Sequence, residues 1–258
     1  MDRELNTKSL LNGAIRLSVV SHEQDDLVEQ LLISIARHCR VENLSVTVTR
    51  NTRTSAKSIF ERFPFPVTVL QNSKPKGFGA NHNQAFATCQ EEYFCVLNPD
   101  ILLSSNLFVR LIACFLSGQN IGIAAPLLVD SEGMLQDSAR RYPTPGRILR
   151  RVVSRKASVY ESRQDSSPIF PDWVAGMFML FPATVYREIG GFDERYFMYC
   201  EDADICIRLA QRGYKTQLVS QVQAVHNARR ASHRTLQHLR WHLSSLLRFF
   251  LRYPFYTL

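Results

Sequence analysis

A carboxylate follows directly on an apolar run at Leu97-Asn98-Pro99-Asp100. The run 93–97 is typical of a buried strand, and the proline stiffens the turn after it. Asp100 is therefore presented at the end of a strand, where a carboxylate can bind Mg²⁺ or Mn²⁺ that bridges two phosphate oxygens. The alternative is a plain turn in which the aspartate caps a helix.

A second group of acids occupies residues 199–204, as Glu201, Asp202 and Asp204. If a helix begins near Glu201, these acids lie at its positive end, and three carboxylates are more than capping needs. Asp204 can pair with Arg208 one turn later. Glu201 and Asp202 are then left to face a cleft, where a carboxylate can act as general base toward a hydroxyl.

Two weaker signals stand elsewhere in the chain. Residues 76–83 (KGFGANHN) form a glycine-containing turn that opens a helix, where backbone can approach a ligand and free N–H groups can bind an anion. His226 ends the last strand-like run, and a neutral imidazole there can complete a metal site. Each also has a plain structural interpretation, since such turns and lone histidines are common.

The elements that must position these residues alternate along the first half of the chain. Short apolar runs are separated by helical patterns, which predicts an α/β fold with a mostly parallel sheet. The predicted strands are 15–21, 44–49, 67–70 and 93–97, and the predicted helices are 27–38, 80–90 and 106–117. Ligands of such sheets lie outside the carboxyl ends of the strands, so we expect the site after these four strands.

The alternation loosens after a fifth apolar run. Residues 138–170 contain prolines and a basic cluster and are interpreted as a lid-like insertion. Regular patterns then return: strands are predicted at 173–181, 216–219 and 222–226, and helices at 183–189 and 201–212.

The positive charge of the chain is concentrated rather than spread. The formal charge is +8, yet no acid follows Asp204, and 140–156 is a second basic cluster. Such clusters attract nucleic acid, anionic lipid or phosphorylated substrates. Leucines at three- and four-residue steps in 232–253 predict a basic amphipathic helix, which can lie at a membrane interface or dock on the core.

Composition excludes several classes of protein. A chain of 258 residues with 45% hydrophobic residues can bury a substantial core, as one large domain or two small ones. Six cysteines without a Cys-x-x-Cys pair indicate reduced thiols and a cytoplasmic protein. No apolar run reaches the roughly 18 residues of a membrane span, and the N-terminus lacks the pattern of an export signal.

Taken in order, several segments resemble those of bacterial family 2 glycosyltransferases with a GT-A fold, above all the rhamnosyltransferases. The segments are VVSHEQ (19–24), GFGANHNQAF (77–86), LNPDI (97–101), DWVAGMFML (172–180), GGFDERYFMYCEDADICIRL (190–209) and AVH (224–226). They span nearly the whole chain, and the block 190–209 is the most specific.

The resemblance implies a Rossmann-like GT-A domain over residues 1–228, with a mostly parallel central sheet flanked by helices. Its nucleotide-binding half is expected at about 13–125 and its acceptor and catalytic half at about 126–228, followed by a basic amphipathic helix in 229–258. The implied reaction is an inverting transfer of a sugar, with dTDP-L-rhamnose as the leading donor. The implied acceptor is a hydroxyl of a glycan, linked through diphosphate to a polyprenol, in the synthesis of cell-surface polysaccharide.

The resemblance also implies roles for single residues. Asp202 matches the catalytic base, with Glu201 beside it, while Asp100 and His226 are the expected ligands of Mg²⁺ or Mn²⁺. The donor surface is expected to comprise Val20, Ser21, His22, Glu23, Asn51, Gly77, Phe78, Gly79, Asn81, Asn83, Asn98 and Asp100. The acceptor side is expected to comprise Trp173, Gly176, Tyr199 and Glu201.

Two positions depart from the family pattern. Asn98 stands where the metal motif usually has its first aspartate, and Thr49-Arg50-Asn51 replaces an Asp-Asn pair at the end of the second strand. Either Arg50 changes how the nucleoside is held, or a neighbour supplies the missing contact.

Other classes of function remain open from the sequence. A catalytically inactive scaffold that binds nucleotide sugars is compatible with both departures. A nucleic-acid-binding protein is suggested by the pI of 9.4, but no binding motif is found, and the acids at 201–204 would repel phosphates without a cation. We expect no nucleic-acid partner and a cytoplasmic protein, peripheral on the inner face of an anionic membrane, whose phosphates the basic clusters can bind.

Overall fold

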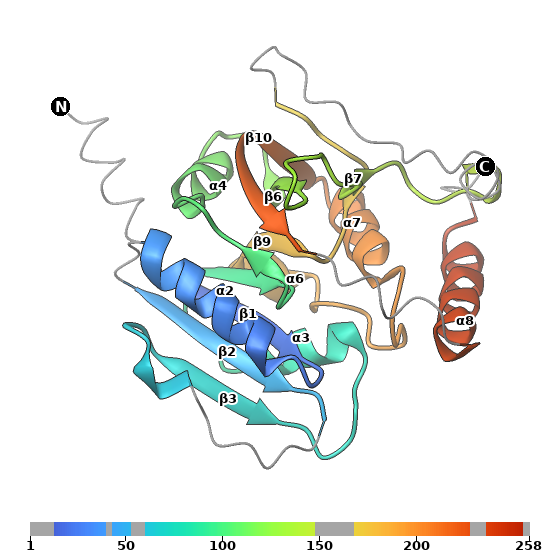
Figure 1. Ribbon diagram of the computed structural model, residues 1–258. Coiled ribbons are helices and arrows are strands. Elements are labelled where there is room, and N and C mark those ends of the chain that lie inside the picture. Colours follow the sequence, from blue (N-terminus) through green and yellow to red (C-terminus); the bar gives the residue numbers. More distant parts are fainter. Residues whose placement is uncertain (1–12, 40–42, 53–59, 148–167, 228–235, 255–258) are drawn as a thin grey trace.

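The computed structural model describes residues 13–39, 43–52, 60–147, 168–227 and 236–254. In chain order the elements are β1 (Ile15–Ser21), α2 (Asp25–His38), β2 (Leu44–Arg50), a 3₁₀ turn (Phe60–Arg62), β3 (Val67–Gln71), α3 (Phe78–Phe86), β4 (Tyr93–Leu97), β5 (Ile101–Leu102), α4 (Phe108–Phe115), β6 (Ile121–Val129), β7 (Ala139–Arg140), β8 (Trp173–Val174), β9 (Phe178–Pro182), α6 (Ala183–Glu188), α7 (Glu201–Gln211), β10 (Lys215–His226) and α8 (Leu236–Arg252) (Figure 1).

One eight-stranded sheet in the order β3-β2-β1-β4-β9-β6-β10-β5 forms the centre of the molecule. Strands β1 to β4 pair in parallel with one another, as do β6 and β10. Strand β9 is antiparallel to both β4 and β6, and the short β5 is antiparallel to β10. The expected α/β fold with a mostly parallel sheet and flanking helices is confirmed.

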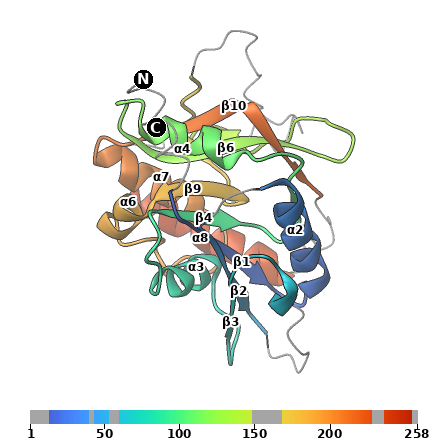
Figure 2. The same cartoon turned by 90° about the vertical axis from the view of Figure 1, so that its left-hand side faces the viewer.

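Helices cover both faces of the sheet, as the view in Figure 2 shows. Apolar side chains of α2 and α4 pack on one face, with Leu31 and Leu111 fully buried. Side chains of α3, α6 and α7 pack on the other, with Tyr186 and Ile205 in that second cluster. The strand residues alternate between the two clusters, because successive side chains of a strand point to opposite faces.

Three predicted elements differ from the structure. The run 173–181 is two strands, β8 and β9, because the backbone between them leaves the sheet: Ala175 N donates to Ser138 O (2.7 Å) and Met177 O accepts from Asn98 N (2.9 Å). Helix α3 ends at Phe86 rather than Gln90. The runs 216–219 and 222–226 are one strand, β10, with a register shift against β6 between them.

The C-terminal region forms α8, which docks on the core through buried Phe249 and Tyr253. Of the two alternatives for the tail, docking is therefore observed, although leucines on its opposite face are exposed. Within the described residues, none of the helices combines the length and apolarity that crossing a membrane requires. Residues 148–167, which include most of the expected basic cluster and insertion, lie outside the described ones. All six cysteines are unpaired, as expected.

Candidate active site

Asp100 lies in the turn between β4 and β5, next to the end of β10. Its Oδ2 is 3.3 Å from His226 Nε2, and its carbonyl oxygen accepts a hydrogen bond from Asn227 N (2.9 Å). The other ring nitrogen of His226, Nδ1, contacts Gln136 Oε1, and Gln136 Nε2 donates to the His226 carbonyl (3.0 Å). Two neighbouring strands therefore deliver a carboxylate and an oriented imidazole to one point, as expected from the sequence.

The Asp100–His226 pair fits a divalent cation in part. Asp100 Oδ1 is buried and has no hydrogen-bond partner among the described residues, as expected of an oxygen that awaits another ligand. A carboxylate and an imidazole are both ligands of Mn²⁺-type ions. Nowhere in the described part of the chain do three His, Cys, Asp or Glu side chains gather. A cation here would therefore need further oxygen ligands from a bound molecule.

Asp202 lies in the first turn of α7, and the backbone directly before this helix is strained. Tyr199 and Cys200 both adopt left-handed backbone conformations, with φ of 73° and 66°, which is uncommon for residues other than glycine. Asp202 Oδ1 then accepts Ala203 N (2.9 Å), and Oδ2 accepts Gly176 N (3.2 Å). Backbone strain of this kind is frequently stored at functional sites, because the surrounding structure must hold it in place.

The loop between β8 and β9 connects the two acids. Gly176 N donates to the Asp202 carboxylate, and the carbonyl of the next residue, Met177, accepts from Asn98 N. Asn98 is two residues before Asp100. A short path of hydrogen bonds therefore joins the turn that carries Asp100 to the helix start that carries Asp202, although the two acids are far apart in the sequence.

Arg140, the first residue of the predicted basic cluster, has a charge that lowers the pKa of Asp202, an effect that the sequence did not indicate. Strand β7 pairs with β8, which places the Arg140 guanidinium 4.9 Å from the centre of the Trp173 ring. The guanidinium is held by an ion pair with Asp137 (3.1 Å) and by the Asp137 carbonyl. The Trp173 indole N–H donates to Arg141 O (2.8 Å), so the ring is fixed as well.

The two adjacent acids have different environments. Glu201 is buried, which raises its pKa well above the ordinary value, and the charge of Asp202 raises it further; its Oε2 has no hydrogen-bond partner among the described residues. Burial also raises the pKa of Asp202, but Arg140 and the N–H groups of Gly176 and Ala203 oppose this rise. Glu201 is therefore buried rather than open as expected, and its roles beside the base and toward the acceptor stay predictions.

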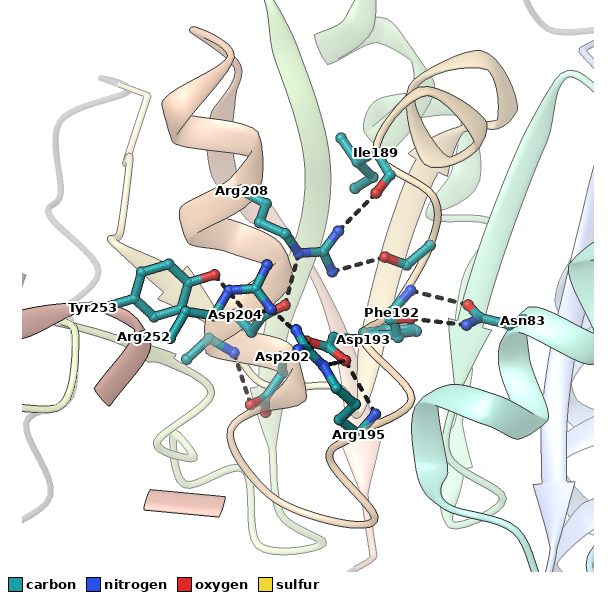
Figure 3. Close-up of polar contacts among 12 residues, drawn as sticks. Asn83, Ile189, Phe192, Asp193, Arg195, Asp202, Asp204, Arg208, Arg252 and Tyr253 are labelled. Carbon is teal, nitrogen blue, oxygen red and sulfur yellow. Dashed lines mark hydrogen bonds and ion pairs between the residues drawn. The ribbon is translucent and has the colours of Figure 1, made fainter. Parts of the chain in front are cut away.

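Asp204 anchors α7 to the rest of the molecule (Figure 3). Its fully buried carboxylate accepts Arg208 Nε (2.7 Å), as predicted, and also the hydroxyl of Tyr253 (2.7 Å) at the end of α8. Arg208 donates in addition to the carbonyls of Ile189 and Gly191. Through these bonds, Arg208 holds the turn at 189–191 against α7, and Asp204 holds the end of α8 against it.

The predicted donor residues Asn51 and Asn81 belong to a buried amide network. Asn72, which the sequence did not single out, donates to the side-chain oxygens of both (2.9 and 2.7 Å). Asn51 Oδ1 also accepts Lys76 N (2.8 Å), and Asn81 Nδ2 donates to Gly77 O (2.9 Å). These side chains fix the loop between β3 and α3, and any direct contact with a donor stays a prediction.

Arg50, at the end of β2, pairs with a carboxylate of the preceding helix. Its guanidinium is 2.6 Å from Asp25 Oδ2 at the start of α2 and lies over the Phe60 ring. Asp25 Oδ1 accepts the hydroxyl of Ser21 (2.6 Å) at the end of β1. Asp25 thus brings a carboxylate to the edge where the family pattern has its acid, while the two alternatives for how the nucleoside is held stay predictions. The sequence alone offered no signal for this pairing.

The glycines of the predicted donor turn approach protein rather than open space. A Cβ on Gly77 would lie 2.6 Å from Phe197 O, and one on Gly79 would lie 2.5 Å from Phe192 Cβ. The first N–H of α3, that of Phe78, donates to Phe197 O (2.8 Å) and is therefore not free for an anion. The turn thus packs against the loop that leads to α7.

The remaining predicted residues are distributed around this edge. His22 and Glu23 are exposed after β1, and Val20 is partly buried. Asn83 points toward the loop after α6, where its Oδ1 accepts Tyr186 OH (2.7 Å) and Phe192 N (2.9 Å). A hollow of about 620 Å³ lies between α3 and the segment before α7, and Lys76, Gly77, Ala80, Asn83, Gln84, Glu194 and Phe197 are among the residues that line it.

Fold and site together define a glycosyltransferase with a GT-A-like fold: a mostly parallel sheet presents one acid after a central strand and a second at a helix start beside it. A family model described as "Glycosyltransferase like family 2" matches residues 13–244. The chain belongs to this family.

Relatives carry rhamnosyl-transfer names. The chain is 28% identical to "Rhamnosyltransferase WbbL" of Escherichia coli K12 over 252 residues, which cover 92% of this chain and 93% of the relative. It is 26% identical to the "N-acetylglucosaminyl-diphospho-decaprenol L-rhamnosyltransferase" of Mycobacterium tuberculosis H37Rv, with 65% of this chain and 60% of that protein covered.

Solved structures share the fold. GalNAc-T7, crystallised with UDP, GalNAc and Mn²⁺, has a TM-score of 0.66 at 14% identity. The matched region covers 85% of this chain and 44% of the GalNAc-T7 chain. The mannosyltransferase PcManGT of Pyrobaculum calidifontis, in complex with GDP-Man and Mn²⁺, has a TM-score of 0.62 at 17% identity. The matched region covers 95% of this chain and 71% of the PcManGT chain. At these identities the likeness concerns the fold alone.

Proposed function

We propose that the protein transfers L-rhamnose from dTDP-L-rhamnose to a hydroxyl of a glycan that is linked through diphosphate to a polyprenol, with inversion at the anomeric carbon. The names of two relatives support the sugar, and the mycobacterial name supports a lipid-diphosphate acceptor. In this proposal, donor binding belongs to about residues 13–125 and acceptor binding with catalysis to about 126–228. The transferase works at the cytoplasmic face of a membrane.

The observation that carries the proposal is the hydrogen-bonded connection between the turn of Asp100 and the carboxylate of Asp202 through Gly176. Asp202 accepts the proton of the acceptor hydroxyl while the acceptor oxygen attacks the anomeric carbon. The attack comes from the face opposite the diphosphate, so a single displacement inverts the centre. Burial raises the pKa of Glu201 beside it, which favours the neutral form of Glu201.

Asp100 and His226 are the residues that would hold Mg²⁺ or Mn²⁺, with the donor phosphates as further ligands. The cation, when bound, neutralises charge on the leaving diphosphate. Gln136 orients His226 from behind, as the outer partners of metal-binding histidines commonly do.

A panel of nucleotide diphosphate sugars tests the proposal. We expect calorimetry in the presence of Mn²⁺ to rank dTDP-L-rhamnose above dTDP-glucose, UDP-N-acetylglucosamine and GDP-mannose. We expect turnover when a polyprenyl-diphosphate-linked sugar is added, with a product of inverted anomeric configuration. Preference for another donor overturns the assignment of rhamnose, and binding without turnover on any acceptor favours the inactive scaffold instead.

A further inference from the structure

Helix α8 exposes five leucines along one face, which we call the leucine stripe. Its members, at three- and four-residue steps, are Leu236, Leu239, Leu243, Leu247 and Leu251, with exposed fractions of 81, 54, 57, 62 and 75%. Between its first and last members the stripe runs about 22 Å along the helix at the usual rise per residue. A contiguous apolar strip of this size on a protein surface marks an interaction site.

The opposite face of α8 packs against the rest of the protein. Ser245 Oγ donates to Met198 O (2.8 Å), and Phe249 is completely buried. The Trp241 ring lies 4.6 Å from that of Phe197. The helix, at the edge of the molecule in Figure 1, therefore has an inner face that contacts the loop before α7 and an outer face that carries the stripe.

The charges beside the stripe identify its partner. Arg240 and Arg248 are exposed, neither pairs with a carboxylate among the described residues, and α8 itself contains no acid. A second copy of this helix would bring two rows of arginines together without a compensating carboxylate, which is unfavourable. Anionic lipid headgroups supply the opposite charge, and the acyl boundary beneath them accepts the leucines.

We propose that the leucine stripe is a docking surface for the interface of an anionic bilayer. Because the inner face of α8 holds residues 197–199, docking places the start of α7 close to the membrane surface. The docking proposal rests on the proposed function in one respect: a lipid-linked acceptor is the reason for the enzyme to lie at a membrane.

The test is co-sedimentation of the full chain with vesicles of phosphatidylcholine alone and of phosphatidylcholine mixed with phosphatidylglycerol. We expect binding to the mixed vesicles only. The double variant Leu243→Gln/Leu247→Gln should bind at least about tenfold more weakly, because two buried leucines are lost. The matched control Leu116→Gln/Met134→Gln removes exposed apolar residues elsewhere and should bind as the wild type does.

The variant Arg240→Gln/Arg248→Gln should lose about fivefold in affinity per arginine and much of the salt dependence, while keeping the stripe. Circular dichroism and thermal unfolding verify that each variant is folded. The proposal is overturned if the leucine variant binds as well as the wild type, or if the wild type does not bind the mixed vesicles. If the wild type instead forms a dimer that the leucine variant abolishes, and does not bind vesicles, the stripe is a contact with a second copy of the chain. Vesicle binding needs neither donor nor acceptor, so it can succeed or fail independently of rhamnosyl transfer.

Discussion

At the scale of single residues, the division of work between Glu201 and Asp202 follows from their surroundings. Both are carboxylic acids in the first turn of α7, yet Asp202 accepts the N–H groups of Gly176 and Ala203, and these bonds and the charge of Arg140 oppose the rise in its pKa that burial causes. These interactions favour its ionised form, whereas burial favours the neutral form of Glu201. A base and a protonated neighbour can therefore stand side by side.

Asp202→Asn removes the base and keeps the shape of the side chain. We expect turnover to fall by about a hundredfold to ten-thousandfold, the usual contribution of a general base, while donor binding changes little. Initial rates and calorimetry with the donor measure the two quantities. Glu132→Gln, an exposed acid in a distant turn, is the control. Turnover within a few-fold of wild type would contradict the role of Asp202.

Glu201→Gln tests the neutral state of the buried acid. Because its pKa is raised in the folded protein, the native state retains a proton that the unfolded chain releases above pH 4.5, the ordinary value. Stability of the wild type therefore falls as pH rises through this window, by up to about 1.4 kcal/mol per pH unit, and the variant lacks this fall. Urea unfolding at about pH 5 and about pH 8 should show the variant gaining stability relative to wild type. A difference that does not depend on pH would refute the neutral state.

Gln136 is expected to act on metal affinity through His226. Replacing it with leucine removes both contacts to the histidine, so the imidazole loses its orientation. We expect the affinity for Mn²⁺, measured by electron paramagnetic resonance in the presence of dTDP, to fall by about ten- to a hundredfold. Gln223→Leu, an exposed position earlier in β10, is the control. An unchanged affinity for Mn²⁺ would show that Gln136 does not act on the metal site.

At the scale of elements, one buried hydrogen bond contributes to the docking of α8 on α7. The Tyr253 hydroxyl donates to the fully buried carboxylate of Asp204, which also pairs with Arg208 and, at 3.5 Å, with Arg252. The strained residues Tyr199 and Cys200 directly precede α7, on the segment that α8 contacts. The C-terminal helix therefore stabilises the segment that leads to Asp202, the proposed base.

Tyr253→Phe should destabilise the protein by about 1–3 kcal/mol, because a buried charged acceptor loses a donor. Tyr214→Phe is the matched control: its hydroxyl also donates to a carboxylate, that of Glu188 (2.8 Å), but at the surface. We expect that change to cost no more than about 0.5 kcal/mol. Urea denaturation measures both, and equal effects would contradict the importance of the buried bond.

At the scale of the whole molecule, β9 lies in the middle of the sheet. It pairs with β4 on one side and with β6 on the other, so one sheet runs between both hydrophobic clusters. Phe249 and Tyr253 extend the second cluster into α8. A molecule connected in this way is expected to unfold as one cooperative unit.

The two tryptophans test this cooperativity. In the variant Trp173→Phe, the remaining Trp241 reports on α8, while far-UV circular dichroism reports on the whole chain. We expect both signals to change at the same urea concentration, since α8 shares its buried residues with the core. An earlier fluorescence transition would mean that α8 undocks before the core unfolds.

Local patterns were sufficient to predict much of the fold. The first four strands, the pairing of Asp204 with Arg208 and the α/β class follow from periodicity and short spacing, and the structure agrees. The single strand predicted at 173–181 was wrong, because its break depends on hydrogen bonds to Ser138 and Asn98, which no local pattern records.

The sequence by itself determined which chemical groups the site contains and which elements carry them, since residue type and periodicity are local properties. Tertiary structure alone decided which groups meet and which ionise: Gln136 reaches His226 across 90 positions, and Gly176 reaches Asp202 across 26. Arg50 meets Asp25, and Glu201 is buried where it was expected to be open. The physical reason is that pairing and desolvation depend on neighbours in space, which chain spacing does not specify.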